Sequence, residues 1–399
     1  MELDFEITHD SNFLEHFLDK RETFKLSAGM VEKLRASNDP YALYGYGRWL
    51  YARRKDREAL LAATRCFTMA AVNGVADAYH MLSKMCTNGH VVSEDNDLLM
   101  LDRELGNYYR SRAEAAGSLL AKLERNVEEF FAGDAAGKEK AINDAREEIG
   151  KESASILWME QLGWFYATTG RNDKAIECYE KCVEEGWNYP IFDLAQIYYQ
   201  RGNIAYHDSL MEEGIEKEVP LCMMFGCENQ GVWDELSASQ REEIREQMSV
   251  NLRRGVELGC PECAYVLSFC LTEGLYDFER DLPAAVAYAR KGMDLGSQMC
   301  CRHLISIMEE DETKKLLPQE MLMTDDEIMM TRLIALRYGD SDMLDDVIEH
   351  ADEYRRMGYG DEIEKVWRPI WDEENREVEG YDIYDAEEED DEYDTIGVC

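Results

Sequence analysis

Two pairs of metal-binding residue types stand out in this sequence. Cys260 and Cys263 are two residues apart, as in many zinc knuckles, and Cys301 and His303 follow later in the chain. Thiolates and imidazoles are the ligands that structural zinc sites use. Because the intervening loop could bring the four side chains together, a shared zinc site stays open as an alternative. Stoichiometric zinc in the purified protein would support it.

Other motifs lack parts that their chemistry needs. The segment 133–138 resembles a phosphate loop, but only three residues separate its glycines and Glu139 stands where a Ser or Thr should hold magnesium. Asp340, Asp342 and Asp345 resemble the start of a calcium loop without its glycine and closing glutamate spacing, which favours a solvated helix start. We therefore predict no catalytic residues, no cofactor and no enzymatic activity.

The charge balance bears on the class of partner. The chain has 84 acidic and 43 basic residues and a net charge of -41, which sets up a field that repels phosphate backbones and anionic lipids. The N-terminal stretch MELDFEITHDSNFLEHF has acids where an export signal has a basic start and an apolar run. We expect a cytoplasmic protein with reduced cysteines that binds neither nucleic acid nor membrane.

An internal repeat organises the elements that carry these residues. Cys263 and the pair Leu267-Ser268 recur 37 positions later as Cys300 and Leu304, and Ala42 recurs 36 positions later as Ala78. The same pairing of a large apolar and a small residue occurs at Leu162-Gly163, Leu194-Ala195 and Phe225-Gly226. Such a period is typical of stacked helical repeats.

Within one unit, apolar residues recur every three or four positions in two runs. The first run holds Trp158, Leu162, Phe165 and Tyr166, and the second holds Ala175, Ile176, Tyr179 and Val183. This spacing predicts two amphipathic helices. The small residue after the leucine lets the second helix approach closely, and a glycine after the second helix can end it in the left-handed conformation. Each unit is thus predicted to be a helical hairpin.

These units resemble the Sel-one-like repeat (SLR) family, a relative of the tetratricopeptide repeat. The similarity is clearest over 40–89 and 259–304, good over 158–202, and degenerate over 90–150 and 203–250. Pro190 and Ile305 stand where the family pattern has Ala and Gly. The resemblance implies an all-α fold, a right-handed α-solenoid of helix-turn-helix repeats that holds other proteins.

The repeat offers a plain interpretation of the cysteines. Cys263 and Cys300 occupy the position that the family fills with Ala, where a small buried residue fits. Equivalent points on stacked helices lie about 8–10 Å apart, beyond the roughly 4.4–6.8 Å that a disulfide spans between Cα atoms. Secreted members of the family join such positions to a cysteine in the preceding helix, but here Val256 and Met293 stand there.

Several side chains on the first helices are predicted to line the inner face of the superhelix. Large aromatic residues with an occasional arginine are typical of interface hot spots. The alternative is that these rings pack between neighbouring repeats. His80 shares this face, and the candidate protein-binding residues are Tyr44, Arg48, Tyr51, Lys84, Trp164, Phe192, Gln196, Tyr199, Tyr265 and Phe269.

The predicted organisation has four parts. They are an N-terminal helical cap (1–39), the repeats (40–312, with a divergent helical segment at 90–150 that holds a divergent unit and a longer helix), a C-terminal helical cap (313–371) and an acidic, disordered tail (372–399). Ser27 and the capping box Thr324-Asp-Asp-Glu327 mark expected helix starts. A further hypothesis is that the tail covers the basic segment 48–57.

The predicted function is a non-enzymatic scaffold or adaptor that binds a protein or peptide in the concave groove of the superhelix. The alternative is an enzyme or zinc-dependent protein that uses the repeats as a frame. A module that holds C-terminal peptides would need basic residues in the groove, for which Arg48 and Lys84 are the candidates.

Overall fold

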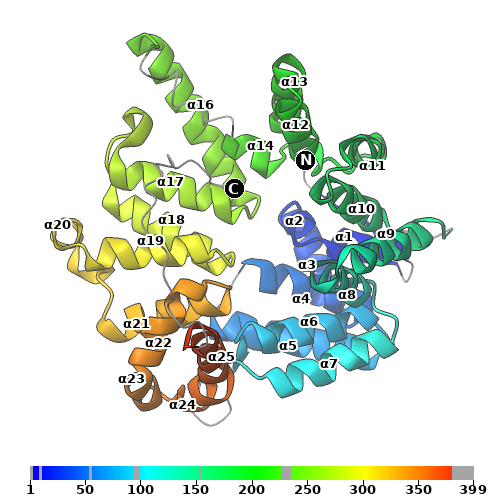
Figure 1. The fold of residues 1–399 in the computed structure, drawn as a ribbon, viewed down its shortest axis with the longest axis horizontal. Coiled ribbons are helices and arrows are strands. Elements are labelled where there is room, and N and C mark those ends of the chain that lie inside the picture. Colours follow the sequence, from blue (N-terminus) through cyan, green and yellow to red (C-terminus); the bar gives the residue numbers. More distant parts are fainter. Residues whose placement is uncertain are drawn as a thin grey trace. The chain divides into compact units, whose positions relative to one another are not determined.

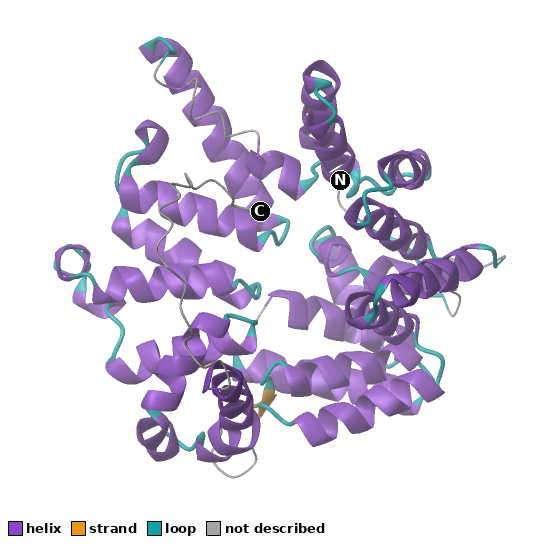
Figure 2. Cartoon of the chain, viewed as in Figure 1, coloured by secondary structure: helices purple, strands orange, loops and turns teal. Residues whose placement is uncertain are grey.

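The computed structural model describes residues 3–8, 11–53, 56–92, 99–151, 155–225, 233 and 235–379. The chain divides into two compact units, Met1–Met343 and Leu344–Cys399. Both are helical, and the described residues contain one short hairpin of strands (Figure 2). Among the described residues, no helix has both the length and the apolar character that crossing a membrane requires.

Helical hairpins follow one another along the first unit (Figure 1). In each hairpin the two helices pack against each other, and each hairpin contacts the next. The predicted all-α solenoid is therefore confirmed. The pairs are α4 (Pro40–Arg53) with α5 (Arg57–Val72), α6 (Ala76–Thr87) with α7 (Arg103–Ala115), α8 (Leu119–Ala132) with α9 (Ala135–Ile149), α10 (Ile156–Thr168) with α11 (Asn172–Glu184), α12 (Ile191–Gln200) with α13 (Ile204–Glu216), α14 (Pro220–Phe225) with α16 (Ala238–Glu257), and α17 (Pro261–Glu273) with α18 (Leu282–Asp294).

Three short helices precede the first hairpin: α1 (Ser11–Leu18), α2 (Lys20–Thr23) and α3 (Ala28–Ala36). The Ser27 hydroxyl accepts a hydrogen bond from the Met30 amide at 3.0 Å, so Ser27 caps α3 as the sequence predicted. Phe17, Met30 and Leu34 are buried in the same apolar cluster as α4 and α5. These helices cover the apolar face of the first repeat, as a terminal cap must.

The segment 90–150 differs in detail from the predicted divergent unit with a longer helix. Strands β1 (Val91–Val92) and β2 (Leu99–Met100) pair antiparallel before α7, and α8 and α9 form a complete hairpin. Ser118 accepts a hydrogen bond from the Ala121 amide, and Asp134 accepts from the Gly137 amide. These two N-caps start separate helices where the composition alone predicted one long helix.

Small residues set the spacing between the helices of a hairpin, as predicted. A Cβ atom on Gly163 would lie 2.5 Å from the Tyr179 ring, and one on Gly47 would lie 2.8 Å from the Phe67 ring. Both rings are buried in the core. The glycine that follows a large residue, Leu162 or Tyr46, thus makes room for an aromatic side chain of the second helix.

The cysteines that begin the first helices fill the space that another glycine leaves. Cys263 and Cys300 are buried at the starts of α17 and α19 (Gln298–Glu309), which confirms the interpretation as small core residues. A Cβ on Gly255 would lie 2.3 Å from the Cys263 sulfur, and one on Gly292 would lie 2.1 Å from the Cys300 sulfur. The residues that face Cys263 and Cys300 are therefore Gly255 and Gly292, each one position before Val256 or Met293.

Gly255→Ala is expected to lower the free energy of unfolding by about 1–3 kcal/mol, because overpacking a filled core site costs this much. Cys263→Ala in the same chain removes the sulfur and should recover part of the loss, while the Cys263 Cβ would remain 3.0 Å from the new methyl group. Denaturant unfolding followed by circular dichroism measures both changes.

The matched control is Gly137→Ala in α9, where the nearest atom, on Asp134, would be 3.6 Å from the new Cβ. There the substitution should stabilise the chain by about 0.5–1 kcal/mol, because alanine restricts the unfolded chain. Equal effects at Gly255 and Gly137 would show that the sulfur does not fill the space opposite Gly255.

The first unit ends with α19, α20 (Asp311–Lys314) and α21 (Asp325–Arg337), besides the 3-10 turns η1 (Leu275–Asp277), η2 (Gln319–Met321) and η3 (Ser341–Met343). Thr324 and Glu327 form the predicted capping box of α21. Asp340 and Asp342, the first acids of the rejected calcium loop, form ion pairs with Arg302. Arg302 therefore compensates part of their negative charge within the protein.

The second unit contains α22 (Leu344–Glu349), α23 (Ala351–Arg356), α24 (Gly360–Glu362), the π-helical turn η4 (Ile363–Trp367) and α25 (Arg368–Glu379). The Trp371 indole donates a hydrogen bond to Asp345 at 2.7 Å, which ties α25 to α22. Helix α25 continues to Glu379, beyond the predicted start of the tail at Asp372. The predicted disorder of 380–399, and any contact of that stretch with the basic segment, lie outside the described residues.

Candidate functional site

A cavity of about 710 Å³ lies within the first unit. Its wall includes side chains of α2, α4 and α6 and residues just before α12, α14, α17 and α19. Figure 1 shows the ends of α2, α4, α17 and α19 turned toward one another in this region. Residues far apart in the sequence therefore meet around one space.

The later repeats reach the cavity through the N-terminal ends of their first helices. Cys260 caps α17, Gly296 comes two residues before α19, and Tyr189 comes two residues before α12. Gly259 and Gly296 have φ angles of +83° and +97°, the left-handed conformation that turns the chain from one helix into the next. Unpaired amides at helix N-termini carry partial positive charge, so these ends favour anionic or hydrogen-bond-accepting groups.

The early repeats contribute three of the predicted binding residues, Arg48, Tyr51 and Lys84, to the same wall. Arg48 is only 7% exposed, and its guanidinium donates a hydrogen bond to the Leu18 carbonyl at 2.8 Å. Lys84 forms an ion pair with Glu124. The Tyr51 hydroxyl and His90 Nδ1 are 2.8 Å apart, and burial raises the pKa of Tyr51.

His80, next to Lys84 on the cavity wall, is held in its neutral form. Burial, together with the positive charges of Lys84, Arg48 and Arg110, lowers the pKa of His80 to about 3. At neutral pH the imidazole can therefore donate one hydrogen bond and accept another. The cavity thus offers a buried guanidinium, a lysine and a neutral imidazole beside apolar surface.

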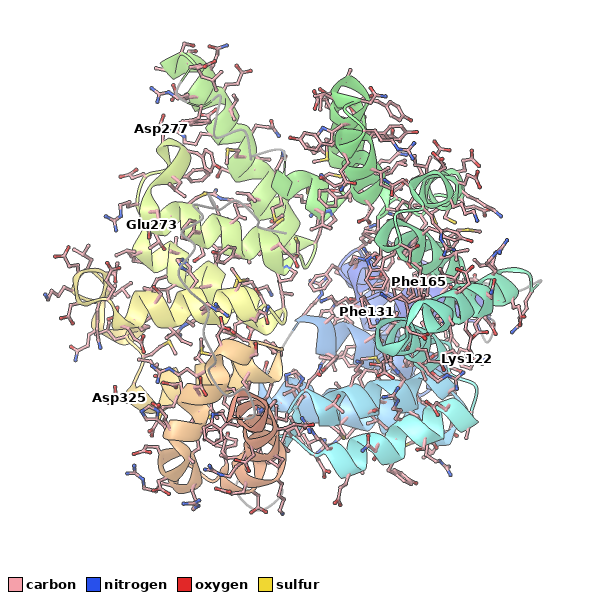
Figure 3. The ribbon with its side chains drawn as sticks, in the orientation of Figure 1. Lys122, Phe131, Phe165, Glu273, Asp277 and Asp325 are labelled. Atoms are coloured by element: carbon pink, nitrogen blue, oxygen red, sulfur yellow. The ribbon has the colours of Figure 1, made fainter. Side chains whose placement is uncertain are left out.

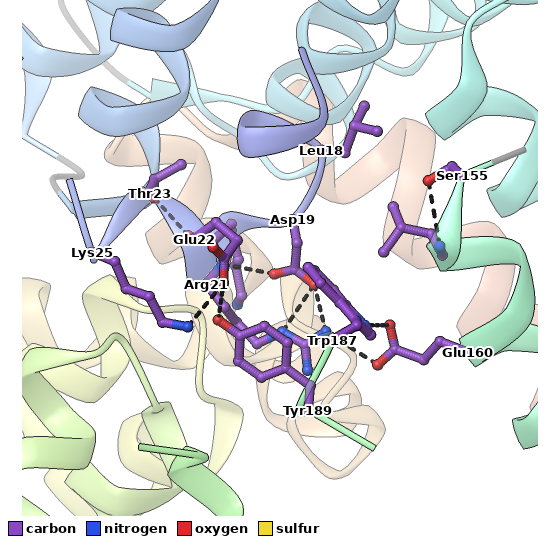
Figure 4. Close-up of polar contacts among 12 residues, drawn as sticks. Leu18, Asp19, Arg21, Glu22, Thr23, Lys25, Ser155, Glu160, Trp187 and Tyr189 are labelled. Carbon is purple, nitrogen blue, oxygen red and sulfur yellow. Dashed lines mark hydrogen bonds and ion pairs between the residues drawn. The ribbon is translucent and has the colours of Figure 1, made fainter. Parts of the chain in front are cut away.

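Residues 18–21 of the N-terminal cap form part of the wall, and the segment 18–26 links repeats that are distant in sequence. Arg21 is hydrogen-bonded to Asp19 at 2.9 Å and to Glu160 of α10 at 3.2 Å (Figure 4). Tyr189 donates a hydrogen bond to Glu22. This network joins the N-terminal cap to α10 and to the loop before α12.

A second connection closes the same unit. Arg337 at the end of α21 donates hydrogen bonds to the Gly89 carbonyl at 3.3 Å and to the Leu99 carbonyl at 3.1 Å. The Tyr338 ring lies 6.4 Å from the His90 ring. The end of α21 therefore contacts Gly89 and strand β2 of the second hairpin, and the neighbouring Tyr338 and His90 both line the cavity.

The other predicted binding residues lie away from the cavity wall. Tyr44 has no exposed surface and packs against Phe67, so it belongs to the core and cannot contact a partner directly. Phe192 and Gln196 are half-buried, whereas Tyr199 is 54% exposed. Tyr265 and Phe269 stack at 5.9 Å and contact the His303 ring.

Trp164 belongs to an aromatic cluster on α8 and α10. It is 38% exposed and its ring lies 5.3 Å from that of Phe131, which is also exposed. Phe130 and Phe165 stack beneath them at 4.1 Å, and Figure 3 shows Phe131 and Phe165 on the two neighbouring helices. Trp164 and Tyr199 are thus the predicted aromatic residues that are most accessible to a partner.

The four residues of the possible zinc site have other contacts. The Cys260 thiol is 3.2 Å from Glu262, the Cys263 thiol donates to the Pro220 carbonyl at 3.4 Å, and His303 Nε2 is 3.2 Å from the Thr272 hydroxyl. Burial raises the pKa of Cys301, which disfavours the thiolate that zinc needs. Among the residues that the structure describes, no three or more His, Cys, Asp or Glu side chains are grouped as a metal site.

The sequence reasoning missed the part of the site formed by Arg21, Glu160, Trp187 and Tyr189. The Trp187 indole donates a hydrogen bond to Glu160 at 2.8 Å, and the Arg21 guanidinium lies over both aromatic rings. Two large aromatics in a loop, Trp187 and Tyr189, are an unusual feature that could have indicated a binding role. Nothing in the local pattern identifies Arg21 as their partner.

Comparisons with known proteins bear on the repeat type. The family model of the tetratricopeptide repeat matches residues 159–185, which covers most of α10 and α11. The same hairpin recurs along the described first unit. The described first unit is built of tetratricopeptide-like helical hairpins. Repeat proteins of this kind generally mediate protein–protein interactions and typically form non-catalytic scaffolds.

Two solved structures are similar to this chain at low identity. A Sel1 repeat protein from Oxalobacter formigenes is 17% identical, with 86% of this chain and 95% of that chain covered and a TM-score of 0.37. A protective antigen of uropathogenic Escherichia coli strains, displaying an SLR fold, is 16% identical, with 83% and 68% covered and a TM-score of 0.34. A search of curated proteins found no match.

Proposed function

We propose that this protein is a non-enzymatic scaffold of the cytoplasm that binds a protein or peptide on the inner side of its helical repeats. The observation that carries the proposal is the cavity of about 710 Å³, where Arg48, Tyr51 and Lys84 meet the helix N-termini of the later repeats. A buried guanidinium and a lysine suit carboxylates and carbonyl oxygens of a peptide. The apolar part of the wall suits its side chains.

The charge of the whole chain also favours a protein over a nucleic acid or an anionic membrane as the partner. The net charge of -41 repels polyanions at a distance, whereas a protein can present both charges over a small area. Trp164 and Tyr199 offer exposed aromatic surface outside the cavity, of the kind that interface hot spots use. We propose that they extend the binding surface beyond the cavity.

Lys84→Glu is expected to reduce capture of the partner by at least about tenfold, because it replaces a cation by an anion beside the ligand. The measurement is affinity capture from the native host with full-length wild-type and variant protein, followed by quantitative mass spectrometry. The melting temperature should change little, since Lys84 contributes a partly exposed ion pair.

Lys140→Glu is the matched control, because Lys140 lies on the surface of α9 and pairs with Glu129 and Asp144. It should capture the same partner as the wild type. Equal recovery with Lys84→Glu would show that the cavity is not the binding surface. If the wild type enriches no protein at all, the scaffold proposal is wrong.

A further inference from the structure

Residues 18–26 are held inside the first unit in the way that a bound peptide would be. Their main-chain carbonyls accept hydrogen bonds from two arginines of α4. Arg48 donates to Leu18 at 2.8 Å, and Arg53 donates to Thr23 at 3.3 Å and to Phe24 at 2.9 Å. Arginine side chains that bind carbonyl oxygens recognise a backbone independently of its sequence. Helix α4 therefore supplies a general peptide contact.

A cage for a guanidinium holds the side chain of Arg21. The Arg21 guanidinium carbon is 3.7 Å from the centre of the Tyr189 ring and 5.8 Å from that of Trp187. Glu160 forms an ion pair with Arg21 at 3.2 Å, and the Trp187 indole fixes the Glu160 carboxylate by a hydrogen bond. Aromatic faces and a carboxylate together suit a planar cation.

A second pocket holds the side chain of Phe24, three positions after Arg21. Phe24 packs with Ala52 and Leu295, and the Arg53 guanidinium lies 4.4 Å from the centre of its ring. Gly259 forms another side, where a Cβ would approach the ring to 2.3 Å. The pocket is thus built by three different repeats and is shaped for an aromatic ring.

The acidic surroundings of the cage also favour a cation. Asp193 lies near Glu160, and burial together with the Glu160 charge raises the pKa of Asp193 to about 6. Arg21 also forms an ion pair with Asp19, which belongs to the same segment. When the segment leaves, Glu160 and Asp193 remain as an acidic site without that cation.

We infer that the surface beneath residues 18–26 is a docking site for a partner peptide. The peptide carries an arginine and, three residues later, an aromatic residue, and the chain's own segment 18–26 occupies the site as an internal ligand. The inference rests on the proposed protein-binding function. Phe17 and Met30 anchor the flanking helices α1 and α3 in the core, so residues 19–25 can leave the site while the cap stays folded.

The internal segment competes strongly because it is tethered. A short tether gives an effective concentration of the order of millimolar, so a free peptide of the same sequence should bind the wild type weakly. Weakening the tethered copy removes this competition. The apparent affinity of the site then rises in proportion to the fraction of molecules in which the site is open.

The test uses a fluorescent peptide that copies residues 16–28, HFLDKRETFKLSA, and the full-length protein. The protein variant with Arg21→Ala and Phe24→Ala should bind this peptide at least about tenfold more tightly than the wild type in fluorescence anisotropy. A peptide with Arg21→Ala should bind that variant about tenfold more weakly than the unchanged peptide. Adding Glu160→Gln and Tyr189→Leu to the protein should abolish the gain.

Circular dichroism establishes that the variants are folded. If the double variant melts below the assay temperature, Arg21→Ala alone, which keeps the Phe24 contact, should still bind the peptide about threefold more tightly than the wild type. The inference is overturned if a folded variant binds the peptide no more tightly than the wild type does. It is also overturned if that variant binds the unchanged peptide and the Arg21→Ala peptide equally well. Either result leaves partner capture through Lys84 unaffected, so the two proposals fail separately.

Discussion

Leu267→Ala is expected to lower the free energy of unfolding by about 2–5 kcal/mol, as large-to-small changes at buried core sites do. Leu267 has no exposed surface and lies on α17, which packs against both α18 and α19. Its loss therefore leaves a cavity within one hairpin and at the junction with the next. Urea unfolding monitored by circular dichroism measures the change.

Leu316→Ala is the control, because the Leu316 side chain is 67% exposed. The same chemical change should there alter the free energy of unfolding by less than about 0.5 kcal/mol. If Leu267→Ala lowers the free energy of unfolding as little as Leu316→Ala does, the assignment of the buried face of α17 is wrong. The phase also determines on which face of α17 the predicted binding residues Tyr265 and Phe269 lie.

Gly259→Ala should destabilise the protein by about 1–3 kcal/mol more than Gly296→Ala does. Both glycines have positive φ angles, +83° and +97°, so alanine meets a similar backbone cost of about 1–2 kcal/mol at each position. Only the Gly259 Cβ would collide with another group, the Phe24 ring at 2.3 Å, whereas nothing lies within 4 Å of the Gly296 Cβ. The difference between the variants therefore reports the Phe24 contact.

A double-mutant cycle makes this test specific. In a chain with Phe24→Ala, Gly259→Ala and Gly296→Ala should cost about the same, because the ring that Gly259 accommodates is gone. Hydrogen exchange of residues 18–26 should increase in Gly259→Ala and stay unchanged in Gly296→Ala. If Gly259→Ala still lowers the free energy of unfolding more than Gly296→Ala in the Phe24→Ala chain, the difference arises in the loop around Gly259 and not from the Phe24 contact.

Local sequence patterns were sufficient to predict the helical hairpins. The spacing of Trp158, Leu162 and Phe165 defines a buried helix face, and Gly163 leaves room for Tyr179 from the second helix. The capping residues Ser27 and Thr324 also start helices where predicted. These features involve residues within one repeat, so helical periodicity and local hydrogen bonding determine them.

The candidate site could be predicted only in part. Arg48 and Tyr51 were predicted to share a face of α4 because they are three positions apart, and both line the cavity together with Lys84 of α6. Their role in binding a partner stays a prediction. Tyr44 fits the same periodicity but points into the core, since its ring meets Phe67 of the second helix. A helical period gives the direction of a side chain and not what lies opposite it.

The sequence alone determined the repeat, its two helices and the role of the small residues, because each depends on neighbours within about forty positions. Only the tertiary structure decided that Arg21 meets Glu160 and Tyr189, that Phe24 meets Gly259, and that Arg337 meets Gly89. These contacts depend on the rotation between successive repeats, which accumulates along a solenoid. Small differences in that rotation decide which distant residues meet, and no local pattern records them.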